Sequence, residues 1–192
     1  TDPITLESVI LPMLGGGKFA EAYALTMTTD DTFIIAGRSD SPKGPQACIW
    51  FQDDTETWVV KGLGSLSHKN VDSIATGIAY RPGSAVGDLI VVGSSRTVLY
   101  PSEAFVWTGD ATLEEEDEED EIGYFYDLEY ILTKTGTGEA SSMGSEWILN
   151  EATGISAAGD RIVGWGVNPE GGVEAWLVTA FPYDELDLSY EE

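Results

Sequence analysis

Short apolar runs separated by turn residues recur along the chain, and they predict strands. Typical runs are 33–37 (Phe-Ile-Ile-Ala-Gly) and 89–93 (Leu-Ile-Val-Val-Gly). They are rich in β-branched residues and end at glycine, which is typical of a buried strand that stops at a tight turn. No stretch longer than about ten residues repeats its apolar positions with the helical period. The pattern therefore predicts an all-β protein.

The runs repeat as units of three strands each. The predicted strands are 20–25, 33–37 and 46–50 in the first unit, 73–79, 89–93 and 103–107 in the second, and 151–156, 161–164 and 173–177 in the third. A fourth apolar run lies beside each unit, at 8–17, 58–64 and 126–132. The last strand of each unit carries a tryptophan, and we expect Trp50, Trp107 and Trp176 to be the repeated core positions.

A unit of about 40–55 residues with four short strands has the size of a β-propeller blade. We therefore expect a single repeat domain over residues 1–192 that is β-propeller-like, with about three four-stranded blades. The unit bounds are 15–60, 61–131 and 132–180, with an acidic insertion at 110–122 and an acidic tail at 181–192. A β-sandwich in which aromatic core positions recur by chance is the alternative.

The third unit lacks a fourth apolar run after 173–177, whereas residues 4–14 form a spare run ahead of the first unit. The apolar residues of this run are Ile4, Leu6, Val9, Leu11 and Leu14. Three blades are too few to close a ring. We therefore expect the N-terminal run to complete the third-unit sheet, in the same chain or in another copy. In the second case two copies make six blades, and the partner of the chain is the chain itself.

These motifs resemble the HAF-type extracellular repeat family over roughly residues 8–180. The matching segments are 14–17 (Leu-Gly-Gly-Gly), 89–93, 103–107 (Glu-Ala-Phe-Val-Trp), 127–128, 152–156, 160–164 and 174–177. The family's histidine before the alanine is replaced by Gln46, Glu103 and Glu174, and the asparagine after Gly-Ile becomes Ala79 or Ser156. The resemblance implies a propeller-like, exported or surface protein of bacteria, and it carries no catalytic residues.

Charge narrows the classes of partner. The chain has 34 acidic and 9 basic residues and a formal net charge of -25. Such a surface repels phosphate backbones and anionic lipid, which excludes nucleic-acid and membrane-surface binding, and no apolar run is long enough to insert into a membrane. It favours cations, a basic protein or solubility in salty water. The chain opens Thr-Asp-Pro without a methionine, so we expect a mature extracellular or cell-surface chain after signal-peptide removal.

Acidic side chains are the candidate cation ligands, and calcium is the cation they suit, although the fold requires no cofactor. The candidates lie in the run 114–121 and in two predicted turns, and they are Glu114, Glu116, Asp117, Asp120, Asp30, Asp31, Asp53 and Asp54. A solvated loop and ordinary turn capping are the simpler interpretations, because aspartate caps nearby backbone amides and no Asp-x-Asp-x-Asp-Gly spacing occurs.

Residues for catalysis are scarce. The chain has one cysteine, Cys48, which we expect to be buried and inert, and one histidine, His68, in a predicted polar loop. The run Gly15-Gly16-Gly17-Lys18 lacks the spacing and the helix of a phosphate loop. No catalytic residue is therefore assigned.

Three tryptophans outside the repeat register, Trp58, Trp147 and Trp165, are candidates for contact with a ligand or partner. The function that we expect is a non-enzymatic secreted or surface module that self-associates through sheet edges and aromatic surfaces. Two alternatives stay open. One is a cation-dependent module that binds extracellular polysaccharide, and the other is a propeller-type glycan hydrolase or lyase with paired carboxylates.

Overall fold

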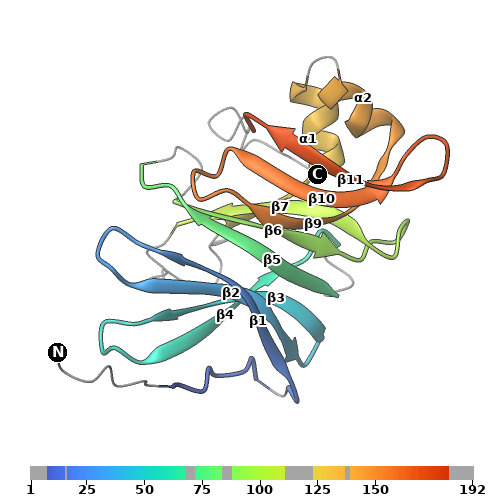
Figure 1. The fold of residues 1–192 in the computed structure, drawn as a ribbon. Helices are drawn as coiled ribbons and strands as arrows, with labels where there is room; N and C mark the ends of the chain where they lie inside the picture. Colours follow the sequence, from blue (N-terminus) through green and yellow to red (C-terminus); the bar gives the residue numbers. More distant parts are fainter. Residues whose placement is uncertain are drawn as a thin grey trace.

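The computed structural model describes residues 8–15, 17–67, 72–83, 88–110, 123–136 and 139–181, and strands dominate it (Figure 1). The strands form three small antiparallel sheets. The prediction of an all-β protein is confirmed at this level. In each sheet the strands follow one another in chain order, so every connection joins neighbouring strands.

The first sheet contains β1 (Ala20–Met27), β2 (Phe33–Ser41), β3 (Gly44–Gln52) and β4 (Trp58–Gly64). The second contains β5 (Ser73–Tyr80), β6 (Leu89–Ser95), β7 (Glu103–Gly109) and β8 (Gly123–Asp127). The third contains β9 (Ile148–Ile155), β10 (Arg161–Val167) and β11 (Val173–Thr179). The expectation of four strands per blade therefore holds for two sheets, and the third has three strands among the described residues.

Two short helices lie between the second and third sheets in the sequence: α1 (Leu128–Thr135) and α2 (Glu139–Glu146). The apolar run 126–132 was expected to be a strand, and this expectation is wrong beyond Asp127. The Asp127 carboxylate accepts the backbone N–H of Glu129 at 2.8 Å and caps the helix. Leu128, Ile131 and Leu132 then fall on one buried face. The helix is too short for its period to stand out in the sequence.

The same β-bulge occurs in the first strand of every sheet. The extra residue is Tyr23 in β1, Thr76 in β5 and Thr153 in β9. Opposite each bulge the second strand carries a glycine, and the carbonyl oxygen two residues before the bulge presses on it. A Cβ atom on Gly37, Gly93 or Gly164 would lie 2.0, 1.9 or 2.0 Å from that oxygen. The repeated glycine is therefore required by the close approach of two strands.

The strand register shows which residues are equivalent among the three sheets. In each sheet, the residue two positions after the bulge glycine pairs with a residue of the third strand. These partners are Gln46, Glu103 and Glu174, which therefore occupy matching positions. Trp50 and Trp107 each lie four residues beyond that position, whereas Trp176 lies two residues beyond it. All three tryptophans are buried. Trp176 is thus displaced by one side-chain repeat and stays on the same side of its sheet.

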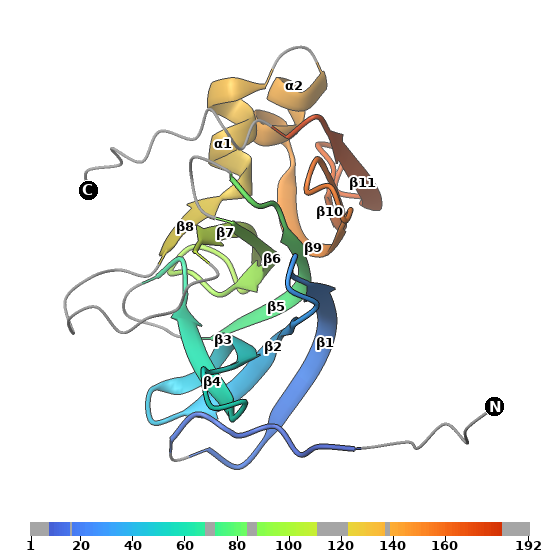
Figure 2. The same cartoon turned by 90° about the vertical axis from the view of Figure 1, so that its left-hand side faces the viewer.

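The sheets lie one after another (Figure 2). The second and third sheets turn equivalent sides toward the sheet that precedes each of them. One core joins the first two sheets, and its fully buried residues include Ile34, Ala36, Ile49, Val91, Phe105 and Trp107. A second core joins the second and third sheets and the helices, and it includes Ile90, Val92, Val106, Leu128, Ile162 and Trp176. Strand β5 contacts β1, β2 and β3, and β9 contacts β5, β6 and β7. The second sheet interface therefore repeats the first.

The described part of the N-terminal run lies against the first sheet. The Trp50 indole N–H donates to the Pro12 carbonyl at 2.7 Å, and the Leu14 N–H donates to Ser39 Oγ at 3.0 Å. Residues 8–14 form no strand. The expectation that this run completes the third sheet of its own chain is therefore wrong for Val9, Leu11 and Leu14, because the short link to β1 holds them on the far side of the stack. Residues Ile4 and Leu6 lie outside the described residues.

No helix in the described ranges has the length and apolarity that a membrane span requires.

The bulge glycine can be tested with Gly93→Ala. The added carbon would lie 1.9 Å from the Ile74 carbonyl oxygen, so the two strands must separate. We expect the free energy of unfolding to fall by about 2 kcal/mol or more, measured by urea denaturation followed by tryptophan fluorescence. Gly154→Ala is the matched control in a strand, because its nearest contact would be an ordinary 3.6 Å from Val163. Equal losses in both variants would contradict this explanation.

Candidate functional site

The edge of the third sheet formed by β11 has no strand paired with it among the described residues. In the first two sheets a fourth strand, β4 or β8, pairs with the third strand. In the third sheet the third strand is β11, and it pairs only with β10 among the residues that the structure describes. One side of β11 therefore presents backbone N–H and C=O groups with no described strand beside them. Such an edge is a template for a further strand.

The third-sheet outer face, which we define as Thr153, Val163, Trp165, Ala175 and Leu177, is the side of that sheet that faces away from the second sheet. All five residues are exposed, and Val163 and Leu177 are 45% and 53% exposed. The Trp165 indole N–H donates to Glu151 Oε2 at 3.1 Å. An apolar sheet face of this kind is usually covered by another layer.

The first-sheet outer face lies at the other end of the stack. We define it as Ala22, Leu25, Met27 and Phe33, which share one side of β1 and β2. Leu25 is 64% exposed and Phe33 is 46% exposed. In the N-terminal segment beside it, Val9 is 61% and Ile10 98% exposed. The two ends of the stack therefore both present apolar surface.

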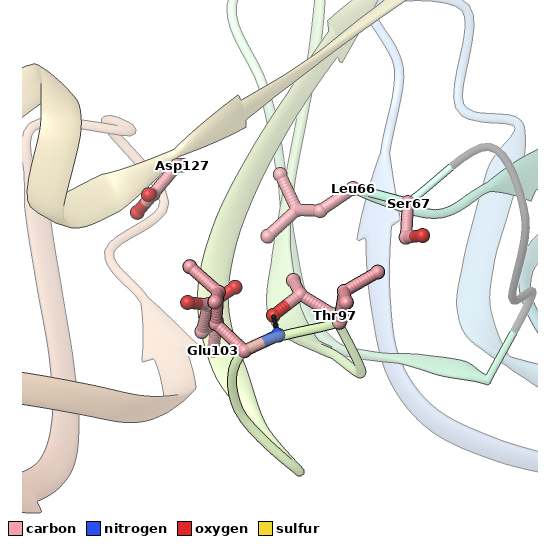
Figure 3. A pocket seen from close by; sticks show the side chains of 7 residues that line it. Leu66, Ser67, Thr97, Glu103 and Asp127 are labelled. Atoms are coloured by element: carbon pink, nitrogen blue, oxygen red, sulfur yellow. Dashed lines mark hydrogen bonds between the residues drawn. The ribbon is translucent and has the colours of Figure 1, made fainter.

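An open cavity of about 450 Å³ lies beside the second sheet (Figure 3). Its lining residues are Leu66, Ser67, Thr97, Val98, Leu99, Glu103 and Asp127. Glu103 begins β7 and Asp127 ends the neighbouring β8, so the sheet itself brings the two carboxyl groups to one wall. Sequence reasoning did not single out either carboxyl group for this pocket, since the pairing of β7 with β8 decides it.

Burial raises the pKa of both carboxyl groups at this wall. For Glu103, burial is opposed by a hydrogen bond from Thr97 and reinforced by the charge of Asp127, and the pKa is raised. For Asp127, burial is opposed by the backbone N–H groups of Glu129 and Tyr130, and the pKa is again raised. Both groups therefore release their protons at a higher pH than exposed carboxyl groups of the same kind.

Glu129, in the first turn of α1, has the largest shift. Burial, followed by the charges of Asp127 and Glu103, raises its pKa to about 7, against a hydrogen bond from the Leu149 N–H. That bond, to Glu129 Oε1, measures 2.5 Å and ties α1 to β9. Glu129 does not line the cavity. Its carboxyl group titrates near neutral pH. The same group joins α1 to β9 through the Leu149 N–H, so we assign it a role in holding these two elements together.

The candidate cation ligands that the structure describes lie in two turns. Glu114, Glu116, Asp117 and Asp120 lie outside the described residues. The Asp53 carboxylate accepts the Thr55 hydroxyl at 2.7 Å and the N–H groups of Thr57 and Thr55, each at 2.9 Å, and these bonds lower its pKa. Asp30 and Asp31 lie in the β1–β2 turn, and Asp54 lies beside Asp53 in the β3–β4 turn. Among the described residues, no three histidine, cysteine, aspartate or glutamate side chains are placed to hold a metal ion.

The three tryptophans outside the repeat register lie in separate places. Trp58 begins β4 and is half-buried. Trp147 packs against the second core beside the helices. Trp165 lies on the third-sheet outer face, so the structure does not join the three into one aromatic surface. Cys48 is buried, and burial raises the pKa of its thiol to about 12. His68 lies outside the described residues.

Comparisons with models of protein families, with curated proteins and with solved structures found no match to this chain.

The raised pKa of Glu129 makes the stability of the fold depend on pH. The folded state binds a proton that the unfolded chain releases near pH 4.5, so stability declines as the pH rises from about 4.5 to about 7. Glu129→Gln keeps an acceptor for the Leu149 N–H but carries no charge. We expect it to raise the free energy of unfolding at pH 8, by at most about 3 kcal/mol, and to change it little at pH 4.

Urea denaturation at pH 4, 6 and 8 measures this effect. Glu170→Gln, at an exposed position in the β10–β11 turn, is the control for removing one negative charge from the surface. A Glu129→Gln variant with the same gain at every pH would contradict the assignment of the effect to this carboxyl group.

Proposed function

We propose that this chain is a non-enzymatic structural module that associates with copies of itself, and that its three sheets are blades of a β-propeller-like ring. The support is the repeated arrangement of bulge, glycine and sheet interface along the stack. The resemblance of the motifs to HAF-type repeats supports a location outside the cell or on its surface, and that location is part of the proposal.

One observation carries the self-association: the N-terminal segment holds the position of a fourth strand. The Leu14 N–H donates to Ser39 Oγ in the first sheet, and the Leu66 N–H donates to Ser95 Oγ in the second, at 3.0 and 3.1 Å. Ser39 and Ser95 are equivalent by register. Leu14 therefore makes the same hydrogen bond to the first sheet that Leu66 makes to the second.

Leu66 directly follows β4, the fourth strand of the preceding sheet. Residues 8–12 precede Leu14 in the sequence by the same number of positions by which the end of β4 precedes Leu66. They therefore lie where a preceding sheet would have its fourth strand, and no sheet precedes the first among the described residues. In a second copy, the side of β11 away from β10 has no described strand beside it and can accept this segment. We propose that the N-terminal segment of one copy pairs with β11 of another.

Two copies satisfy both requirements. Each copy gives one strand and accepts one, so a two-fold dimer closes with six blades, within the range of about four to eight seen in propellers. The net charge of -25 on each chain opposes this contact at low salt. Salt screens that repulsion, so the association should strengthen as ionic strength rises.

The mass in solution tests the proposal. We expect twice the chain mass of 20.7 kDa in sedimentation equilibrium, with the dimer favoured by 0.5 M over 0.05 M salt. Val9→Pro combined with Ile10→Pro removes two consecutive backbone donors from exposed positions, and we expect this variant to be a monomer. A synthetic peptide of residues 1–14 should bind the variant.

Val9→Thr combined with Ile10→Thr is the matched control, because it removes the same apolar side chains and keeps the backbone donors. It should remain a dimer. A wild-type chain that sediments as a monomer at every salt concentration overturns the proposal, and so does a proline variant that dimerises as well as the threonine variant.

A further inference from the structure

The two outer faces of the stack correspond, position by position, to the two sides of the sheet interfaces inside the chain. On the third-sheet outer face, Val163 of β10 pairs with Leu177 of β11. The counterparts of this pair are Val92–Val106 in the second sheet and Ala36–Ile49 in the first. Those four residues are all completely buried, because each pair packs against the following sheet.

The first-sheet outer face has the opposite relation. Leu25 corresponds by register to Ile78, and Phe33 corresponds to Leu89. Ile78 and Leu89 are 6% and 0% exposed, because that side of the second sheet packs against the first. Leu25 and Phe33 lie on a sheet with no described sheet before it, and they are exposed.

The hydroxyl group of the bulge threonine also shows that the third-sheet outer face corresponds to a side that is covered in the second sheet. In β5 the bulge residue Thr76 lies 3.3 Å from the Val92 carbonyl and also donates to the Ala152 carbonyl in the third sheet. Its counterpart Thr153 lies 3.4 Å from the Val163 carbonyl, which is the equivalent contact within its own sheet. Thr153 is exposed, and it lies where Thr76 reaches across to the next sheet.

We infer that the third-sheet outer face of one copy packs on the first-sheet outer face of a second copy, as a continuation of the two sheet interfaces within each chain. The inference rests on the proposed function: it adds a contact between the two outer faces to the pairing of the N-terminal segment with β11. In this packing Val163 and Leu177 cover Leu25 and Phe33, and the Thr153 hydroxyl donates to the Ala22 carbonyl of the second copy. Ala22 is exposed here, whereas its counterparts Ala75 and Ala152 are completely buried.

The contact is heterologous, because one face of the chain meets a different face of its partner. In a two-fold dimer it occurs twice, and the ring closes. A contact between two third-sheet outer faces would be isologous, and it would leave the first-sheet outer face uncovered. Single substitutions on the two faces distinguish these arrangements.

Leu177→Glu and Leu25→Glu each place a carboxylate at the centre of one outer face. Both positions are more than half exposed, so we expect each chain to fold, as checked by circular dichroism. Sedimentation equilibrium in 0.5 M salt should show at least a tenfold weaker dimer for each variant alone. Leu99→Glu, at a leucine that is 82% exposed in the β6–β7 loop, is the matched control and should dimerise as the wild type does.

Mixing gives the sharper test. A Leu177→Glu chain retains its first-sheet outer face, and a Leu25→Glu chain retains its third-sheet outer face. An equimolar mixture should therefore form a heterodimer through one intact contact, although neither variant pairs with itself. A Leu25→Glu variant that dimerises normally overturns the heterologous contact.

The outcomes separate this inference from the proposed function. If the wild type is a dimer that depends on the N-terminal strand but tolerates both glutamate substitutions, the strand exchange stands and the face contact is wrong. If the wild type is a monomer, both are wrong.

Discussion

The structure depends on a close contact between two backbones, which recurs in each sheet. A bulged first strand drives a carbonyl oxygen against the second strand, and only glycine leaves room for it at Gly37, Gly93 and Gly164. The bulge turns one residue of the first strand out of the ladder and increases the local twist. The bulge occurs at the equivalent position in all three sheets, and the second sheet interface repeats the first. Small residues follow the bulge in β5 and β9, where a Cβ on Gly77 would lie 3.2 Å from the Gly154 Cα.

A stack of sheets with one polarity has two different ends. Each sheet uses one side for the preceding sheet and the other for the following one, so an open stack leaves an unused surface of each kind. Among the described residues, the unused surfaces are the first-sheet and third-sheet outer faces, together with the side of β11 away from β10. A solenoid or ring of repeats meets the same problem with caps or with closure. The N-terminal segment is a partial cap, since Pro12 and Leu14 satisfy Trp50 and Ser39 and leave Leu25 and Phe33 uncovered.

The carboxyl groups beside the helices follow from the same packing. Asp127 caps α1 from the end of β8. Glu129 then reaches the β9 backbone at Leu149. Burial of these acids works against the fold at neutral pH, and the helix that they hold in place contributes Leu128, Ile131 and Leu132 to the core. The apolar burial outweighs the electrostatic cost in a chain that already carries a charge of -25.

The sequence by itself determined the strands and their repetition. Runs that end in glycine mark the second strand of each sheet, because the glycine is needed for local backbone contact and local chemistry is visible in the sequence. The pattern also showed that no fourth apolar run follows 173–177 and that an apolar run precedes the first unit. The tryptophan was a less reliable landmark, since a residue displaced by two positions stays on the same side of a strand, as Trp176 does.

Only the tertiary structure decided which elements the runs 8–14 and 126–132 pack against. The run 126–132 has the composition of a strand, and Asp127 turns its second half into a helix that covers the core. The carboxyl groups of Glu103, Asp127 and Glu129 meet because β7, β8 and α1 pack together, and nothing in their spacing separates them from the other acids. The described part of the N-terminal run lies on the first sheet, where the Pro12 carbonyl accepts the Trp50 indole N–H. Burial and hydrogen-bond partners depend on which surfaces meet, and a linear pattern does not contain that information.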